Sequence, residues 1–167
     1  TKAVPSGLML VPKAFSLANY SALLSNDSIW RALFVTIGRI AVGVCLQLLV
    51  TFFCAYGMTR KQLPYRRAIS LFLFIPSYIS GGLIPLYILY AKIGLLNNPL
   101  VYVLPTAFSF FNFILCRTYI SSIPDRLDES ARLDGAGEMT VMLRIYLPLA
   151  LPIIATIALF NIVGHWN

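Results

Sequence analysis

Four apolar stretches constrain the fold of this chain more than any other feature of its sequence. They cover residues 31–58, 68–90, 100–120 and 145–163, and a helix that spans a bilayer needs about 20 mostly apolar residues. Hydrophobic residues make up 59% of the 167 residues and charged residues only 11%, whereas a soluble domain is about one-quarter charged. The sequence therefore predicts an all-α, polytopic helical membrane bundle with about four spans.

The distribution of basic residues predicts how these spans are oriented. Eight basic residues lie in or beside two of the connecting loops: Arg60, Lys61, Arg66, Arg67, Arg117, Arg126, Arg132 and Arg144. Four lie on the opposite side: Lys2, Lys13, Arg31 and Lys92. Because loops rich in Lys and Arg stay in the cytoplasm, loops 60–67 and 121–144 are expected inside the cell and the N-terminal segment outside. This topology also accounts for the net charge of +7, so no nucleic-acid partner is expected.

Two further residue types in the apolar stretches have several interpretations. Arg39 lies inside the first stretch, where it either snorkels, lines a cavity or faces a partner. Cys45, Cys54 and Cys116 lie in or beside apolar stretches without paired spacing. We therefore expect reduced thiols and no metal site.

The chain is predicted to form one membrane domain. Residues 1–30 form an external lead-in, 31–120 three spans, 121–146 a cytoplasmic loop and 147–163 the fourth span. No signal peptide precedes residue 31 and the chain does not begin with Met. An exported N-terminal segment then requires an upstream span, and the last residue directly follows an outward-going span, so truncation at both ends is expected.

One charged insert interrupts this apolar chain. It holds five of the six acidic residues, namely Asp125, Asp128, Glu129, Asp134 and Glu138. Anionic lipid headgroups would repel these carboxylates. A protein docked from the cytoplasm would satisfy both the acidic and the apolar faces of the insert, and an ordinary solvated amphipathic loop is the alternative.

Local patterns predict two short helices within the insert. Ser122 is expected to cap the first helix, and Asp128 and Arg132 have the favourable i, i+4 spacing. Gly135 is expected to turn the chain sharply at positive φ. The second helix is predicted from an apolar stripe at i, i+3, i+4 and i+7, formed by Met139, Met142, Leu143 and Tyr146.

The segments "ESARLDGA" and "IYLPLALP" resemble the EAA loop of ABC-importer permeases. The residues that match the family pattern are Glu129, Ala131, Asp134, Gly135, Ala136, Leu147, Pro148 and Pro152. Ser130 replaces an alanine of that pattern, and Met142 stands where the family often has phenylalanine. The segments "FSLANY", "GGLIPLY" and "GHWN" resemble carbohydrate-uptake permeases related to the maltose transporter, in the branch that imports complex oligosaccharides.

The resemblance implies a transport subunit with six spans, of which this chain holds the second to fifth. It implies a second homologous permease, two cytoplasmic ATPase subunits, an extracellular or periplasmic solute-binding protein and a sugar substrate, in the bilayer of the bacterial cytoplasmic membrane. The residues that would form the ATPase-coupling loop are Glu129, Ser130, Ala131, Asp134, Gly135, Ala136, Met139 and Met142. ATP and Mg²⁺ would bind to the partner, since this chain has no G-x-x-x-x-G-K-[ST] motif. Neither an enzyme activity nor a cofactor of its own is expected.

Residues in the apolar stretches supply candidates for a substrate path. Aromatic, amide and glycine positions there are Tyr78, Gly81, Gly82, Asn112 and Asn161. Interhelical hydrogen bonding or interfacial anchoring is the alternative for their polar groups. Similarly, the break at Pro76, Gly81–Gly82 and Pro85 indicates either a pathway or a packed kink. His165, the single histidine, is either an interface residue or a sugar contact.

Three other functions compete with sugar import. An ABC permease for another solute would share the EAA-like loop. A secondary transporter would need intramembrane acids to bind its coupling ion, and the four apolar stretches contain none. A membrane-embedded enzyme would need clustered His, Asp or Glu residues, and a single histidine disfavours most versions of it.

Overall fold

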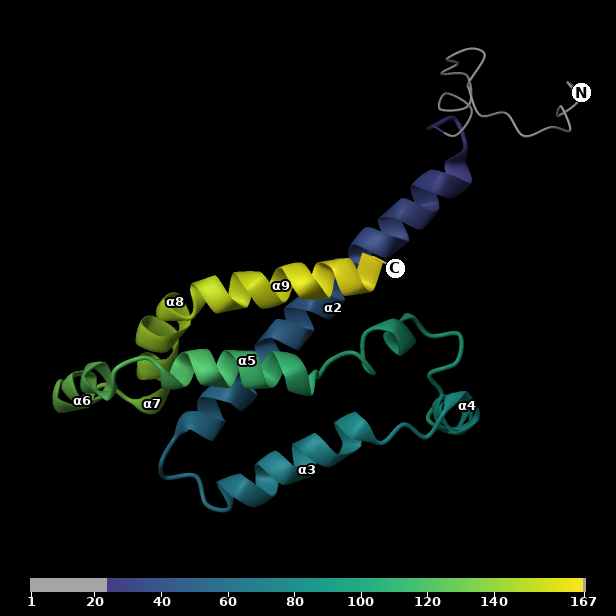
Figure 1. Ribbon diagram of the computed structural model, residues 1–167. Coiled ribbons are helices and arrows are strands. Elements are labelled where there is room, and N and C mark those ends of the chain that lie inside the picture. Colours follow the sequence, from purple (N-terminus) through teal and green to yellow (C-terminus); the bar gives the residue numbers. More distant parts are fainter. Residues whose placement is uncertain (1–23, 167) are drawn as a thin grey trace, which may run out of the picture. The chain divides into compact units, whose positions relative to one another are not determined.

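The computed structural model describes residues 24–166, and this part of the chain contains helices and turns but no strand (Figure 1). The all-α prediction is therefore confirmed. The chain divides into two units, Thr1–Val35 and Thr36–Asn167. Most of the expected lead-in and the last residue of "GHWN" lie outside the described residues.

The described part of the first unit forms the start of helix α2 (Asp27–Thr59). Asn26 caps it, because its Oδ1 accepts a hydrogen bond from the Ser28 backbone N–H at 3.0 Å. Trp30 Nε1 donates to the Leu24 carbonyl at 2.8 Å. The helix thus begins at residue 27, four residues before the expected start of the first span at residue 31.

The rest of α2 confirms the first predicted span. With 33 residues, α2 is the one helix within residues 24–166 that is by itself long and apolar enough to cross a membrane. A helix of this length extends about 50 Å, which exceeds the roughly 30 Å of a hydrocarbon core.

The second apolar stretch folds as two helices rather than one. Helices α3 (Arg66–Tyr78) and α4 (Leu83–Lys92) meet at an angle of 113°. Pro76 lies in the last turn of α3, where it cannot donate a backbone hydrogen bond. Gly82 then takes φ +83°, a conformation that favours glycine. The pair is either one broken span or a re-entrant segment.

The third apolar stretch does not form a continuous span. It consists of a 3₁₀ turn, η1 (Pro99–Tyr102), an irregular segment that contains Pro105, and helix α5 (Phe110–Ser121). Ser109 caps α5 through its hydroxyl, which accepts from the Asn112 backbone N–H at 3.4 Å. A helix of 12 residues extends only about 18 Å, less than a hydrocarbon core.

The fourth apolar stretch is bent by 72° near its start. Helix α7 (Glu138–Val141) leads into a π-helical segment, η2 (Met142–Tyr146), then α8 (Leu147–Leu149) and α9 (Leu151–Trp166). Counting each bent pair as one span, residues 24–166 provide up to three spans by length and composition. The fourth expected span would have to include the broken segment before α5.

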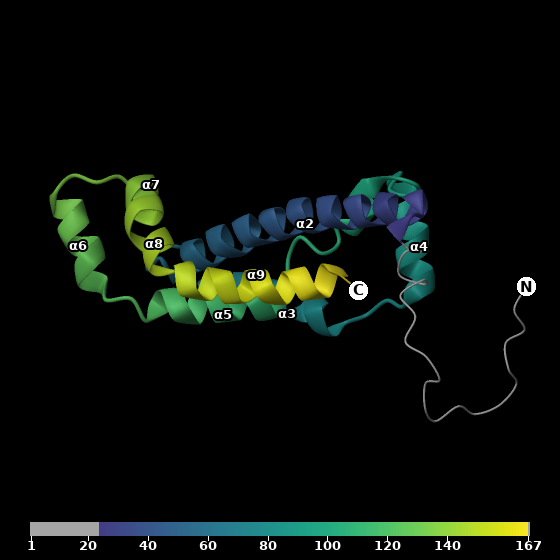
Figure 2. The same ribbon diagram turned by 90° about the horizontal axis from the view of Figure 1, so that it is seen from above.

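The core of the second unit lies where α2, α5, η2 and α9 meet (Figures 1 and 2). Its buried residues are Phe52, Ala55, Tyr56, Met58, Phe113, Cys116, Ile120, Val141, Met142, Tyr146, Ala150 and Ile157. Figures 1 and 2 both show α5 and α9 side by side. By contrast, α3 and α4 contribute no buried residue.

Arg39 forms its contacts within this chain. Its guanidinium donates to the carbonyl of His165 and lies over the ring of Tyr102, 5.3 Å from the centroid. His165 is buried, with 8% of its surface exposed. These contacts support a structural role for His165 over a sugar contact, and they place Arg39 against neighbouring helices.

Candidate functional site

Helix α6 (Asp125–Leu133) forms the first arm of the charged insert and ends in a Schellman turn. The Ala136 N–H donates to the Ala131 carbonyl at 2.9 Å, and the Gly135 N–H donates to the Arg132 carbonyl at 3.0 Å. Gly135 has φ +80°, so its predicted positive φ is confirmed. Ala131 and Ala136 both pack against the core. The "DGA" sequence thus has a direct structural basis. Gly135 permits the positive φ of the turn, and the hydrogen bond from Ala136 to Ala131 completes it.

The predicted cap of α6 is wrong. The Ser122 hydroxyl donates to the Tyr119 carbonyl at 2.7 Å, which places Ser122 at the end of α5 instead. Pro124 occupies the N-cap position of α6 without a side-chain hydrogen bond. Acidic residues in the first turn, Asp125 and Asp128, complement the positive end of the helix dipole.

The second arm follows the predicted apolar stripe only in part. Met142 and Tyr146 are buried as expected, whereas Met139 and Leu143 are exposed and Val141 is buried instead. The helix widens here, because the Leu147 N–H donates to the Met142 carbonyl five residues back. Pro148 would clash with the Arg144 carbonyl in a regular α-helix. The π-helical turn avoids this clash while Met142 and Tyr146 keep their buried positions.

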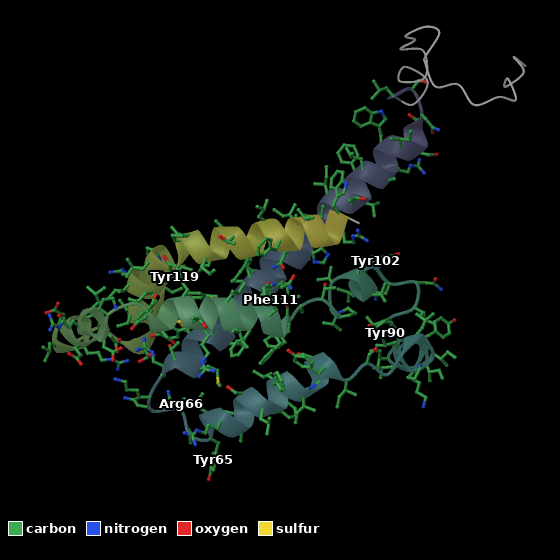
Figure 3. The ribbon with its side chains drawn as sticks, viewed as in Figure 1. Tyr65, Arg66, Tyr90, Tyr102, Phe111 and Tyr119 are labelled. Carbon is green, nitrogen blue, oxygen red and sulfur yellow. The ribbon has the colours of Figure 1, made fainter. Side chains whose placement is uncertain are left out.

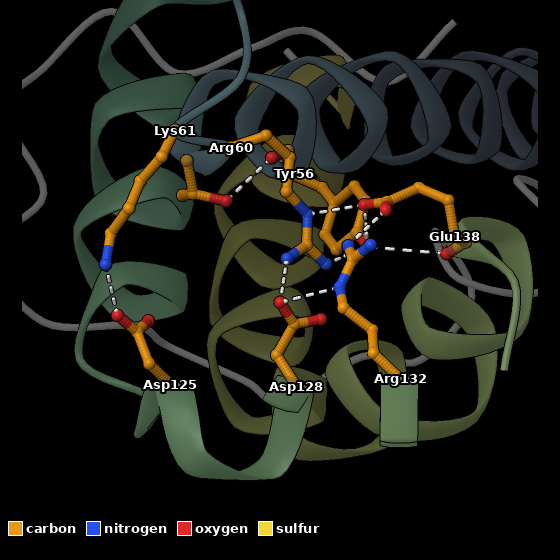
Figure 4. A network of polar contacts seen from close by, with 8 residues as sticks. Tyr56, Arg60, Lys61, Asp125, Asp128, Arg132 and Glu138 are labelled. Atoms are coloured by element: carbon orange, nitrogen blue, oxygen red, sulfur yellow. Dashed lines mark hydrogen bonds and ion pairs between the residues drawn. The ribbon is translucent and has the colours of Figure 1, made fainter. Parts of the chain in front are cut away.

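Arg60 joins the end of α2 to both arms of the insert (Figure 4). Its Nη1 lies 2.8 Å from Asp128 Oδ2, on α6, and its Nε lies 2.6 Å from Glu138 Oε1, on α7. Tyr56 donates from its hydroxyl to Glu138 Oε1 at 2.7 Å. The guanidinium lies 4.2 Å from the centroid of the Tyr56 ring and 4.9 Å from that of Tyr146.

Arg132 closes this network from within the insert. Its Nε lies 3.2 Å from Asp128 Oδ2, so the predicted i, i+4 ion pair is confirmed. Its Nη2 also pairs with Glu138 across the Gly135 turn. We call Tyr56, Arg60, Asp128, Arg132 and Glu138 the Arg60 network. Arg60, Asp128 and Arg132 line a cavity of about 620 Å³.

A separate ion pair lies beside the network, between Lys61 Nζ and Asp125 Oδ2 at 2.7 Å. The hydrogen bond from Lys61 lowers the pKa of the Asp125 carboxyl, and it raises the pKa of Lys61. Since the pKa of Asp125 is depressed, this pairing is lost only as the pH falls through that lowered value. Both side chains are mostly exposed, at 81% and 64%, so water screens the pair.

The contacts change the interpretation of the acidic insert. Asp125, Asp128 and Glu138 pair with this chain's own basic residues, so they need no external partner. Glu129 and Asp134 form no ion pair within residues 24–166 and are exposed. Sequence reasoning missed Tyr56 and used Arg60 only to predict topology. The available signal was the presence of two cations directly after α2 and an excess of acids in the insert.

An apolar surface accompanies these two free acids. Leu127, Leu133 and Met139 are exposed on the arms of the insert, with Leu133 89% exposed. Ser130 and Gly135 are also at the surface. Of the predicted coupling residues, Met142 is in the core, Ala131 and Ala136 are half-buried, and the others remain accessible.

The predicted substrate-path residues fall into two groups. Asn112, on α5, donates from Nδ2 to Asn161 Oδ1, on α9, at 2.8 Å, and both residues are buried. Tyr78, Gly81 and Gly82 lie exposed at the break between α3 and α4. The two groups are not joined by a hydrogen bond within the described part of the chain, and the Asn112–Asn161 bond agrees with the interhelical alternative.

Tyr78 lines an open cavity of about 620 Å³. The aromatic side chain of Phe111, labelled in Figure 3, is another part of its lining. Polar groups in the lining come from Gln47, Ser77, Thr106 and Ser109. A mainly apolar cavity with a few polar groups is typical of small-molecule sites, and sequence reasoning had identified only Tyr78 in it.

Comparison with known proteins places this helical arrangement in a family. Residues 47–167 match the family model described as "Binding-protein-dependent transport system inner membrane component". This segment contains α3 to α9 and the whole charged insert.

Curated relatives match nearly the whole chain. It is 35% identical to the polygalacturonan/rhamnogalacturonan transport system permease protein YtcP of Bacillus subtilis, over 98% of this chain and 57% of that protein. It is 37% identical to protein LplC of the same organism, over 95% of this chain and 54% of the relative. It is 29% identical to the alpha-glucoside transport system permease protein AglG of Rhizobium meliloti, over 93% of this chain and 43% of the relative. The chain thus spans about half the length of these relatives.

The family model covers well over half of the chain, and it covers the elements that form the core and the insert. The chain belongs to the family of binding-protein-dependent transport system inner membrane components.

Proposed function

We propose that this chain is part of the permease subunit of an ABC importer that moves a sugar or oligosaccharide into the cell. ATP hydrolysis takes place on a separate subunit, which the insert 121–146 contacts. Membership of the binding-protein-dependent family is the observation that carries this proposal. An ABC permease for another solute remains the alternative, because the same insert would serve it.

The shape of the insert supports docking of a cytoplasmic partner. Two short arms, α6 and α7, meet at the Gly135 turn and are held by ion pairs within the chain. Their outer surface keeps Leu127, Leu133 and Met139 exposed beside the unpaired acids Glu129 and Asp134. Apolar anchors next to charged groups are typical of protein interfaces.

The names of the relatives support a carbohydrate as the substrate. One relative is named for polygalacturonan and rhamnogalacturonan transport and another for alpha-glucoside transport. We infer an oligosaccharide for this chain too. Tyr78, with Gly81 and Gly82 at the nearby helix break, is the proposed contact with the path, while Asn112 and Asn161 would act mainly by joining helices.

The full importer would contain partners that follow from this function. They are a second homologous permease, two ATPase subunits that bind ATP and Mg²⁺, and an extracellular or periplasmic solute-binding protein. The protein would lie in the bacterial cytoplasmic membrane, with the insert in the cytoplasm and the N-terminal segment outside. The chain itself would bind no cofactor.

A pair of glycine substitutions tests whether the insert couples to an ATPase. Gly135 has φ +80° and Gly137 has φ −72°, and a Cβ at either position would meet no atom within 4 Å. Gly135→Val therefore strains the backbone by about 1–3 kcal/mol, whereas Gly137→Val does not. In full-length protein reconstituted with its partners, we expect Gly135→Val to lower ATPase association and ATP-dependent oligosaccharide uptake by about tenfold or more.

Gly137→Val is the matched control and should retain both activities. Normal uptake by the Gly135→Val protein would contradict the proposed role of the insert. Failure of the unmodified importer to take up any oligosaccharide, while it transports another solute, would favour the alternative substrate class.

A further inference from the structure

The side chain of Arg60 lies where three elements of the chain meet. Arg60 directly follows Thr59, the last residue of α2, and its side chain forms ion pairs with Asp128 on α6 and Glu138 on α7. Only 17% of its side chain is exposed. No other basic residue within residues 24–166 forms ion pairs that join α2's end to both arms of the insert.

The geometry requires the guanidinium group rather than any positive charge. Nη1 donates to Asp128 on α6 and Nη2 donates to the Tyr56 hydroxyl, while the Glu138 carboxylate on α7 lies within ion-pair distance of Nε. Three nitrogens of one planar group thus have three different neighbours. The plane also lies against the rings of Tyr56 and Tyr146, as arginine does in cation–π contacts. A lysine ammonium is a compact point charge and would not reproduce this arrangement.

Apolar packing alone holds the first arm weakly. Helix α6 contributes no buried residue, and its contact with the core comes through the half-buried Ala131 and the nearby Ala136. Asp128 and Glu138, by contrast, bind both Arg60 and Arg132. The attachment of α6 to α2 therefore depends largely on the Arg60 network, whereas Val141, Met142 and Tyr146 pack the second arm into the core.

We propose that Arg60 is a positioning residue that fixes α6, the first arm of the insert, to the end of α2, so that this arm and the end of α2 move as one body. The part of this inference that concerns transport rests on the proposed function. Force applied to this arm would then pass directly into α2, the longest helix within residues 24–166, rather than being absorbed by the loop between α5 and α6.

The neighbouring Lys61 provides a matched control. Its ion pair with Asp125 also joins the end of α2 to α6, but through one exposed contact. Exposed single ion pairs add little to stability. Arg60→Gln and Lys61→Gln remove the same charge from adjacent positions, so a difference between them reports the geometry of the network rather than the charge.

The first measurement is the distance between two spin labels in the full-length protein in nanodiscs. Cys45, Cys54 and Cys116 are replaced, and labels are placed at the exposed positions Leu49 on α2 and Leu133 on α6. We expect one narrow distribution of label-to-label distances in the protein that keeps Arg60 and Lys61, and also in the Lys61→Gln variant. In the Arg60→Gln variant, we expect the distribution to broaden or to show a second distance. Arg60→Lys should give an intermediate width.

A second label pair, Leu49 and the exposed Leu159 on α9, reports the bundle itself. Broadening confined to the α2–α6 pair supports the inference. If Arg60→Gln broadens the distance distributions of both label pairs, the conservative variant Arg60→Lys decides. A broader distribution for the α2–α6 pair alone then supports the inference, and an unchanged distribution for that pair overturns it.

The second measurement is the amount of solute transported per ATP hydrolysed by the reconstituted importer. We expect Arg60→Gln to lower this ratio by about tenfold, within the usual range of coupling effects, while Lys61→Gln leaves it unchanged. An unchanged ratio, or an unchanged distance distribution, for Arg60→Gln would overturn the inference. If the unmodified protein binds no ATPase, the proposed function fails, and the distances still decide whether Arg60 fixes the insert.

Discussion

Gly38 and Gly43 lie on the same helix, but only Gly43 is a packing site. A Cβ added at Gly43 would come within 2.9 Å of His165 Cε1, whereas one added at Gly38 would meet nothing within 4 Å of the described residues. Small residues let helices approach closely in membranes. The structure thus assigns this role to Gly43 and not to Gly38.

Gly43→Ala should therefore destabilise the bundle although alanine is the better helix former. The gain in helix propensity is about 1 kcal/mol, and overpacking in a well-packed site costs about 1–3 kcal/mol. We expect a net loss for Gly43→Ala and a net gain for Gly38→Ala, measured as thermal unfolding in detergent. A Gly43→Ala protein as stable as Gly38→Ala would show that His165 does not lie against α2.

Residue identity alone predicted some site features and not others. The positive φ of Gly135 and the Asp128–Arg132 pair depend on residues close in sequence, so local rules were sufficient. The pairing of Arg60 with Asp128 spans 68 positions. It depends on how α2 returns to the insert, which no local pattern specifies, and an external partner was therefore inferred for charges that the chain neutralises itself.

At the scale of elements, apolar length predicted where helices occur but not where they stop. Residues 27–59 form one helix because no proline interrupts them. Pro76 and Gly82 end or redirect the second stretch, and Pro105 lies in the irregular segment before α5. Hydropathy cannot distinguish a continuous span from a broken one of equal composition.

The Asn112–Asn161 hydrogen bond is a test of how α5 and α9 are held together. Removing the Asn112 side chain takes away the donor to Asn161 Oδ1, and Asn161 Nδ2 already has no hydrogen-bond partner among the described residues. Interhelical hydrogen bonds in membranes contribute about 0.6 kcal/mol on average. We expect Asn112→Ala and Asn161→Ala each to destabilise the protein, and the double variant to lose less than the sum in a double-mutant cycle.

The same variants distinguish this role from a sugar contact. If the pair only joins helices, the KM for the oligosaccharide should stay constant while stability falls. A raised KM at unchanged stability would instead place both asparagines in the substrate path.

At the scale of the molecule, two segments far apart in sequence must lie on one side of the bilayer. Lys61 pairs with Asp125 at 2.7 Å and Arg60 with Asp128 at 2.8 Å, so the turn after α2 and the insert are in contact. Basic residues had predicted both segments to be cytoplasmic. The contact between the two segments does not depend on the distribution of basic residues. It requires that the turn after α2 and the insert lie on the same side of the membrane, whichever side that is.

Cysteine labelling then determines which side this is. In full-length protein without its native cysteines, Arg126→Cys lies in the insert and Asn97→Cys in the turn after α4, and both native side chains are exposed. Because the basic loops stay inside, a membrane-impermeant maleimide should label Asn97→Cys in right-side-out vesicles and Arg126→Cys in inverted vesicles. Labelling of Arg126→Cys from outside would exclude a cytoplasmic ATPase as the partner of the insert. The Arg60 network would still hold the insert to α2 in that case, because its contacts do not depend on which side of the membrane they face.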